Sequence, residues 1–229
     1  MDAEADARTE HAEPATAGVR IDDPLRTAPM GWAAIAGAVA ASIANLAVLL
    51  AAVHAPVDTV SYPLSPGAFR AGQVFFAGTQ LLMTLGMVGL ERSGAAGAGP
   101  WARRFGGAVI VGYAITVVGE LVLIPVATAS IDATGTSAAT SVFGIGVLIA
   151  DIGLIGYGVL ARRAAVWGRG WATLLIALGI FQLLVVTPVA IGAGFASGAA
   201  FAVITAQNAL IVALGWKLTR PRAIASPIG

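Results

Sequence analysis

The sequence predicts an all-α, polytopic membrane protein with six transmembrane helices. Three observations predict this class: the composition, the length of the apolar segments and the distribution of the basic residues. The chain of 229 residues is 58% hydrophobic and 11% charged. A soluble domain has about a quarter charged residues, so this deficit of charge is typical of a chain that lies in a bilayer.

Six apolar segments account for the composition. They cover residues 31–53, 71–90, 106–129, 138–161, 171–193 and 197–216. Each has about the 20 residues that an α-helix needs to cross a hydrocarbon core of ~30 Å. We therefore expect a six-helix transmembrane bundle over residues 30–220, between a cytoplasmic tail over 1–29 and a short cytoplasmic tail over 221–229. The first tail is rich in acids and prolines and poor in large apolar residues, which predicts disorder.

The basic residues predict the orientation of the bundle. Twelve of the 13 Lys and Arg residues lie before the first segment, between the second and third, between the fourth and fifth, or after the sixth. Only Arg70 lies on the other side. Because basic loops stay in the cytoplasm, we expect both termini there. The excess of Arg over Lys and the many Ala, Gly and Val residues favour a bacterial origin, so the expected location is the bacterial inner membrane.

The tryptophans follow the same asymmetry. All five lie near the side that carries the basic loops: Trp32, Trp101, Trp167, Trp171 and Trp216. Tryptophan is enriched where a bilayer meets water, so we expect these side chains to anchor the bundle at the cytoplasmic interface.

A weak internal repeat accompanies the six segments. The odd-numbered segments end in Pro-Val, at Pro56-Val57, Pro125-Val126 and Pro188-Val189. The even-numbered segments carry a polar residue, Gln80, Asp151 or Asn208, eleven or twelve positions before a basic residue. This pattern favours three helical-hairpin repeats. Because each unit has two helices, the repeats would be parallel to one another.

Two acids lie inside the apolar segments, and they are the main functional candidates. These are Glu120 and Asp151, and no Lys, Arg or His lies within any of the six segments. An ionised side chain within a bilayer costs several kcal/mol unless it is paired or hydrated, so intramembrane acids indicate function. We expect at least one of the two to be protonated near neutral pH. A neutral carboxyl group in a dry site is a suitable general acid, so we assign a catalytic role to Asp151, Glu120 and Tyr113.

Polar residues on other segments complete the candidate site. Tyr113, Thr116 and Glu120 share one helical stripe because they follow i, i+3, i+7 spacing. The predicted substrate-binding residues are Asn45, Gln80, Thr116, Gln182 and Asn208. The alternative for these side chains is that they join helices, since amides and hydroxyls commonly form hydrogen bonds across transmembrane helices.

Other chemistries lack their residues. The chain has no cysteine, which excludes disulfides, thiol catalysis and cysteine-based metal sites. It has no phosphate-binding glycine loop, no zinc-protease motif and no serine-hydrolase motif. We expect no metal and no cofactor, because His54 and Asp58 alone are too few ligands. The basic loops are short and already explained by membrane topology, so we expect no nucleic-acid partner.

Several short sequences resemble those of six-helix membrane proteins from actinobacteria. The matching sequences are Val53-His54-Ala55-Pro56, Gly78-Thr79-Gln80-Leu81-Leu82, Leu85-Gly86-Met87-Val88-Gly89-Leu90 and Gly119-Glu120-Leu121. The layout is also similar to that of the DUF998-type membrane proteins. The resemblance covers most of residues 30–220. It implies a six-helix bundle and no particular activity.

Three functions fit these observations. The first is an intramembrane site for an apolar small molecule, in its most specific form a terpene-cyclase-like lyase or isomerase that uses Asp151 as proton donor. The second is a proton-coupled transporter or exporter, which at this size implies a homodimer. The third is a non-catalytic membrane subunit. All three functions imply the lipid bilayer as a partner. The first two also imply a small molecule.

Overall fold

The structure, a computed structural model, describes residues 24–220 and contains only helices and loops within them. The helices are α1 (Pro24–Leu49), α2 (Pro66–Arg92), α3 (Pro100–Val122), α4 (Thr134–Ala164), α5 (Arg169–Phe181), the π-helix η1 (Gln182–Val186), α6 (Thr187–Ala193) and α7 (Gly198–Thr219). The elements α5, η1 and α6 follow one another without a break and form one span. Within this part of the chain, six helical spans are long and apolar enough to cross a membrane. The predicted all-α class and the six predicted spans are therefore confirmed.

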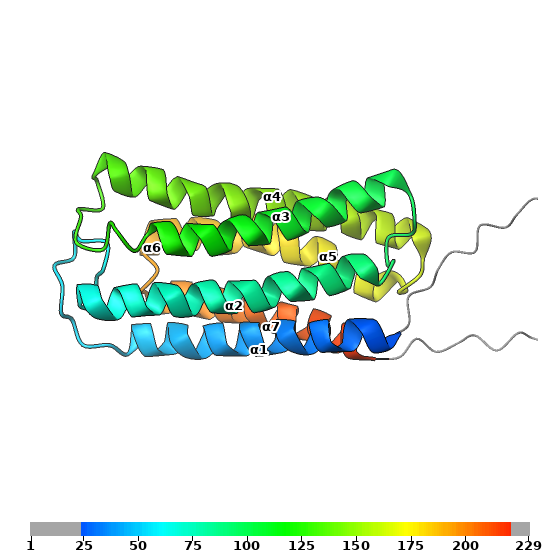
Figure 1. Cartoon of the computed structure of the whole chain (residues 1–229), viewed down its shortest axis with the longest axis horizontal. Coiled ribbons are helices and arrows are strands. Elements are labelled where there is room, and N and C mark those ends of the chain that lie inside the picture. The colour runs from blue at the N-terminus through cyan, green and yellow to red at the C-terminus, as the bar shows by residue number, and fades with distance from the viewer. Residues whose placement is uncertain (1–23, 221–229) are drawn as a thin grey trace, which may run out of the picture.

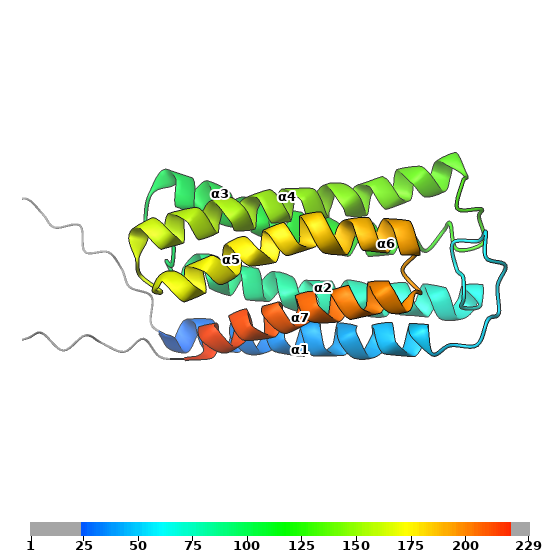
Figure 2. The same ribbon diagram turned by 180° about the vertical axis from the view of Figure 1, so that it is seen from behind.

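The six spans form a closed ring of antiparallel neighbours. In ring order, α1 contacts α2, α2 contacts α3, α3 contacts α4, α4 contacts α5, and α5 and α6 contact α7, which returns to α1. Figures 1 and 2 show this bundle from two opposite sides, with all helices running along its long axis. Both ends of the described chain lie at the same end of the bundle.

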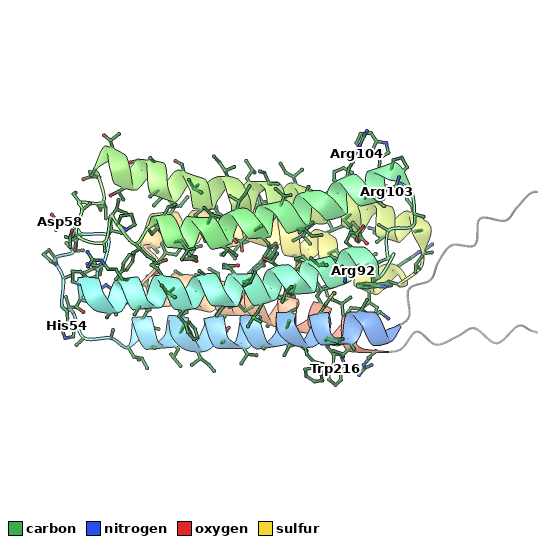
Figure 3. All side chains as sticks on the ribbon, viewed as in Figure 1. His54, Asp58, Arg92, Arg103, Arg104 and Trp216 are labelled. Atoms are coloured by element: carbon green, nitrogen blue, oxygen red, sulfur yellow. The ribbon has the colours of Figure 1, made fainter. Side chains whose placement is uncertain are left out.

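The two ends of the bundle differ in charge. We call one the basic end; it carries both described chain ends and the loops 93–99 and 165–168, with most of the described Arg residues and Lys217 nearby. The other, the loop end, carries residues 50–65, 123–133 and 194–197. In Figure 3, Arg92, Arg103, Arg104 and Trp216 lie at the basic end, and His54 and Asp58 at the loop end. The segregation of basic residues that the sequence predicts is thus present in the fold.

Glycine allows the neighbouring helices to approach closely. A Cβ atom placed on Gly112 of α3 would lie 2.4 Å from the backbone nitrogen of Ala150 in α4. A Cβ atom on Gly31 of α1 would lie 2.6 Å from the carbonyl oxygen of Gly215 in α7. In a bilayer, small residues at such crossings allow van der Waals contact between backbones, which is a main source of helix association.

The outer surface of the bundle is apolar along its length. Large hydrophobic side chains exposed on the helices include Ile43, Leu46, Val74, Leu81, Leu85, Val111, Val118, Ile145, Leu148, Ile152, Ile180, Leu184 and Ile191. They come from every span except α7, which exposes Trp216 near its end. A soluble protein rarely exposes so much contiguous apolar surface, whereas lipid tails cover it at no cost.

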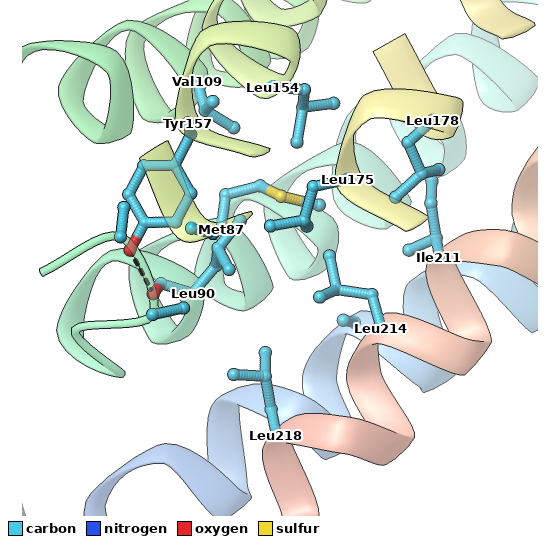
Figure 4. Packing of buried hydrophobic residues seen from close by; sticks show 14 of the residues in the cluster. Met87, Leu90, Val109, Leu154, Tyr157, Leu175, Leu178, Ile211, Leu214 and Leu218 are labelled. Carbon is cyan, nitrogen blue, oxygen red and sulfur yellow. Dashed lines mark hydrogen bonds between the residues drawn. The ribbon is translucent and has the colours of Figure 1, made fainter. Parts of the chain in front are cut away.

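The interior is divided into two halves. The apolar half, toward the basic end, is filled by a cluster of large side chains that includes Met87, Leu90, Val109, Leu154, Tyr157, Leu175, Leu178, Ile211, Leu214 and Leu218. Figure 4 shows these side chains packed together, with the Tyr157 hydroxyl donating to the Leu90 carbonyl at 3.0 Å.

The polar half, toward the loop end, is built differently. Its buried polar residues include Gln73, Thr79, Thr116, Glu120, Thr136, Gln207 and Asn208. Many of its described buried apolar residues on the helices are alanines, among them Ala77, Ala139, Ala190 and Ala200. The interior of the bundle therefore changes from large and apolar to small and polar along its axis.

The first helix begins earlier than the sequence predicts. Residues 24–29, expected to belong to the disordered tail over 1–29, form the first turns of α1. Proline is tolerated in a first helical turn because that N–H has no helical partner, so Pro24 can start the helix. The Thr27 hydroxyl donates to the Leu218 carbonyl at 3.2 Å and fastens this turn to α7. The predictions for residues 1–23 and 221–229 lie outside the described residues.

The first and third spans also end earlier than predicted, because their last residues form a loop-end cap. The α1 helix ends at Leu49 rather than at residue 53, and α3 ends at Val122 rather than at residue 129. The Val60 N–H donates to the Ala129 carbonyl at 3.0 Å, and the Ile131 N–H donates to the Asp58 carbonyl at 2.8 Å. These two bonds join loop 50–65 to loop 123–133 across the end of the bundle.

The fifth span contains the π-helix, and Pro188 provides its physical cause. Pro188 has no N–H to donate to the Leu184 carbonyl, so the regular ladder is interrupted one turn earlier. The Thr187 N–H donates instead to the Gln182 carbonyl, five residues back. The three Pro-Val pairs of the predicted repeat therefore differ locally: Pro56 and Pro125 lie in loops, whereas Pro188 lies within a helix.

Candidate functional site

Asp151 lies in the middle of the bundle, at the boundary of the two halves. It is 2% exposed, and its Oδ2 atom has no hydrogen-bond partner among residues 24–220. On one side, Gly179 of α5 lies against the Asp151 backbone, where an added Cβ would be 2.6 Å from the Asp151 carbonyl oxygen. On the other side, Gly112 of α3 lies against Ala150. The close approach of three helices therefore encloses this acid.

Tyr113 lies on the turn of α3 that packs against the turn of α4 carrying Asp151. It is 9% exposed and follows Gly112 in α3, and Gly112 packs against Ala150, which directly precedes Asp151. No hydrogen bond joins the two side chains in the described structure. Of the three residues predicted to be catalytic, the fold thus brings two together, Asp151 and Tyr113.

Gln207 of α7 lies on the other side of α5 from Asp151. Its Nε2 atom donates to the Leu178 carbonyl at 3.3 Å, and its Oε1 atom is buried without a partner in the described part of the chain. Leu178 directly precedes Gly179, which contacts the Asp151 backbone. One turn of α5 therefore connects Gln207 to Asp151.

Sequence reasoning did not select Gln207. It selected the adjacent Asn208, because Asn208 precedes Arg220 at the interval found for the other even-numbered segments. In a helix, adjacent residues point about 100° apart, and an isolated sequence does not show which of the two faces the neighbouring helix. Helix α7 is apolar around most of its surface, so no stripe distinguished the two amides.

Asn208 and Asn45 instead belong to the α1–α7 contact. The Asn208 Nδ2 atom donates to Ser42 Oγ at 3.0 Å, and the Ser42 hydroxyl donates to the Ala38 carbonyl at 3.0 Å. Asn45 donates to the Ala41 carbonyl of its own helix, also at 3.0 Å. The position of Asn208 is that of a residue that joins two helices, which was the alternative to ligand binding.

Glu120 is buried in the polar half but is remote from Asp151. It is 8% exposed and has no hydrogen bond to another described side chain. Gly119 packs against Phe143 of α4, so Glu120 lies near the level of residue 142, nine residues before Asp151. At a rise of 1.5 Å per residue this is about 13 Å along the helix pair. The two acids therefore do not share one binding position.

The remaining predicted residues lie around this axis. Thr116, between Tyr113 and Glu120, is 4% exposed and donates to the Tyr113 carbonyl at 2.7 Å. Gln80 of α2 is half-buried. Gln182 begins the π-helix, and its Nε2 atom lies 3.5 Å from Thr187 Oγ1. Thr116 extends the site toward Glu120, and no contact in the structure connects Gln80 or Gln182 to Asp151.

The described residues offer no cluster for a metal ion. No group of three or more His, Asp or Glu residues within the described range lies close enough to hold one. His54 Nδ1 lies 2.6 Å from the Ala52 carbonyl oxygen in its own loop. Among the residues of this site, the buried groups that could form hydrogen bonds or transfer a proton are Asp151, Tyr113 and Gln207. They lie in a fold with six helical spans long and apolar enough to cross a membrane.

No protein-family model matches the chain, and no curated protein or solved structure matches it significantly.

Proposed function

We propose that this protein is a multi-pass protein of the bacterial inner membrane that binds an apolar small molecule at Asp151. The positive-inside rule supports a cytoplasmic basic end and cytoplasmic termini. In this proposal the six spans form three parallel helical-hairpin repeats, and the protein is related to the DUF998-type membrane proteins. The observation that carries the functional part is the buried Asp151 Oδ2, which has no partner among the described residues.

A carboxyl group buried between transmembrane helices, such as that of Asp151, lowers the stability of the fold. Asparagine or serine would join helices at lower cost than a carboxyl group in hydrocarbon. A buried polar atom without a partner destabilises a fold by about 1–3 kcal/mol, and such costs are typical of functional sites. A ligand that offers a hydrogen-bond donor to Asp151, with an apolar remainder, would satisfy this oxygen.

The chemistry proposed for this site is proton donation. A neutral Asp151 carboxyl would transfer its proton to a carbon of an alkene, and a proton lost from the resulting carbocation would restore the acid. The ring of Tyr113 would stabilise the positive charge through its π-face. The reaction class is that of a lyase or isomerase of the terpene-cyclase type, and it needs no cofactor.

The experiment is native mass spectrometry of the full chain in mild detergent. We compare the wild type with Asp151→Asn, which keeps the shape of the side chain and removes the acid. Asp132→Asn is the matched control, because Asp132 is exposed in the loop 123–133. The expected result is an apolar molecule bound to the wild type and to the control and lost from Asp151→Asn. Equal occupancy in all three samples contradicts the proposal.

Infrared spectroscopy tests the proton donor separately. A protonated carboxyl group gives a C=O stretching band that an ionised one lacks, and the band of Asp151 would disappear in Asp151→Asn. The expected band is present at neutral pH because hydrocarbon disfavours the charged form. If both Glu120 and Asp151 are ionised at pH 5, proton donation by Asp151 is excluded.

One observation favours a second candidate, a proton-coupled transporter that acts as a homodimer. Glu120 and Asp151 lie on adjacent helices at depths that differ by about 13 Å, as two positions for one proton would. Proton flux into liposomes that falls in both Glu120→Gln and Asp151→Asn would support it. Flux that is the same with and without the protein excludes it.

A further inference from the structure

The polar half contains buried oxygen atoms that no donor within residues 24–220 reaches. They are Oε1 of Gln73 on α2, Oδ2 of Asp151 on α4, and Oγ1 of Thr205 and Oε1 of Gln207 on α7. Three separate spans contribute them. Buried polar groups in folded proteins almost always have a partner, either in the protein or in ordered water. Their grouping in one half of the bundle therefore indicates that water serves as the partner there.

The size of the neighbouring side chains agrees with this reading. Many buried apolar residues of the polar half are alanines, and alanine fills little volume between helices. A site can hold water when it is polar and has room for it. The interior between Asp151 and the loop end combines buried polar oxygens with many small side chains.

The apolar half provides neither condition. Leu90, Leu154, Leu175, Leu178 and Leu214 are each at most 1% exposed, and they pack against one another across the ring. Its polar groups are bonded within the protein, as the Tyr157 hydroxyl is to the Leu90 carbonyl. This half therefore separates Asp151 from the basic end.

We infer that water reaches Asp151 from the loop end only, through the polar half, in which Thr116 and Glu120 of α3 are also buried. The water would connect the Asp151 carboxyl to one aqueous phase. Glu120 is a second polar residue in the same half, about 13 Å nearer the loop end. The functional importance of this water rests on the proposed function, because water access matters most if Asp151 exchanges a proton or a ligand.

Two residues of α3 form a matched pair for testing the route. Val109 and Thr116 are seven positions apart on one helical stripe, and they are 1% and 4% exposed. Gly153 of α4 packs against Val109, and Gly146 packs against Thr116, so the level of Asp151 lies between them. The chain has no cysteine, so Val109→Cys and Thr116→Cys each introduce a single thiol of similar size to the original side chain.

The measurement is the rate at which each thiol reacts with a small cationic methanethiosulfonate in sealed membrane vesicles. The reagent is charged and attacks thiolates, so it modifies a cysteine only where water is present. Exposed Thr128→Cys marks the loop end and exposed Ala98→Cys marks the basic end, which identifies the side of addition. Thermal unfolding in detergent confirms that each variant is folded.

The expected result is that Thr116→Cys reacts at least about tenfold faster than Val109→Cys, and only when reagent is added from the loop-end side. Equal rates for the two, no reaction of either, or reaction of Thr116→Cys from the basic-end side would overturn the inference. If an α3 variant does not fold, Thr205→Cys and Ile211→Cys provide the same comparison on α7. The labelling needs no ligand, so its failure is distinguishable from the failure of the proposed function.

Discussion

The two halves of the bundle are built from the same helices, but their interiors are filled with different kinds of side chain. Toward the basic end, large buried side chains pack into one apolar cluster that fills the ring. Toward the loop end, the ring encloses alanines, amides, hydroxyls and an acid, and several buried oxygens have no partner in the described structure. The first arrangement stabilises a fold, and the second costs stability. The stability that the apolar half contributes therefore offsets the cost of the polar half, which is where a functional site is expected.

The largest effect is expected at the seam between α3 and α4, which runs through both halves. Gly112→Ala places a Cβ atom 2.4 Å from the Ala150 backbone nitrogen, so the helices must separate. We expect a loss of about 3 kcal/mol or more in the free energy of unfolding. Gly107→Ala is the control, because no atom lies within 4 Å of its Cβ position. Equal melting temperatures for the two variants in detergent would show that the close contact at Gly112 does not hold α3 and α4 together.

The next effect distinguishes the halves directly. Leu214→Ala removes a fully buried side chain from the apolar half, and we expect a cost of about 2 kcal/mol, mostly from the cavity that it leaves. Val186→Ala removes two methyl groups from the polar half, a smaller side-chain volume than Leu214→Ala removes, and should cost less than about 1 kcal/mol. Unfolding in mixed detergent micelles, followed by tryptophan fluorescence, measures both. A larger loss for Val186→Ala would contradict the division of the interior.

The sequence could predict the six spans because their signal is local. A chain in hydrocarbon must satisfy its backbone hydrogen bonds within each segment, so length and hydropathy suffice. Residues 24–29 were assigned to the tail because Pro24 and Pro29 indicate an irregular chain by composition. Pro24 stands at the start of α1, where a proline is compatible with a helix, and Pro29 lies inside it. The polar stripe of α3 was also predictable, because Tyr113, Thr116 and Glu120 recur at helical spacing and are all buried.

The partners of these residues were not predictable, because they depend on the register between helices. Contacts of Gly112 and Gly119 set the α3–α4 register, and this places Tyr113 near Asp151 and Glu120 far from it. No local pattern in either helix encodes that offset. Gln207 was missed for the same reason, since its relation to Asp151 passes through a turn of α5 that belongs to neither residue's helix.

A smaller effect of opposite sign is expected at the boundary of the halves. Asp151→Leu removes a buried acid without a partner and adds apolar surface where Tyr113 and Gly179 lie nearby. We expect unfolding to require about 1 kcal/mol more, with loss of the bound molecule, because functional groups are commonly kept at the expense of stability. Asp132→Leu in the exposed loop should change stability by less than about 0.5 kcal/mol. A strong destabilisation by Asp151→Leu would assign this acid a structural role instead.

The smallest effect concerns the one side-chain hydrogen bond described between α1 and α7 in the polar half. Asn208 donates to Ser42 at 3.0 Å, and both partners are satisfied, unlike the oxygens of Gln207 and Asp151. Hydrogen bonds between transmembrane helices contribute about 0.6 kcal/mol on average, so a double-mutant cycle of Ser42→Ala and Asn208→Ala should give a coupling of that size. The same variants should leave the bound molecule in place, because this bond joins helices and does not contact Asp151. Loss of the molecule in Asn208→Ala would move Asn208 into the binding site and extend that site across the ring to α1.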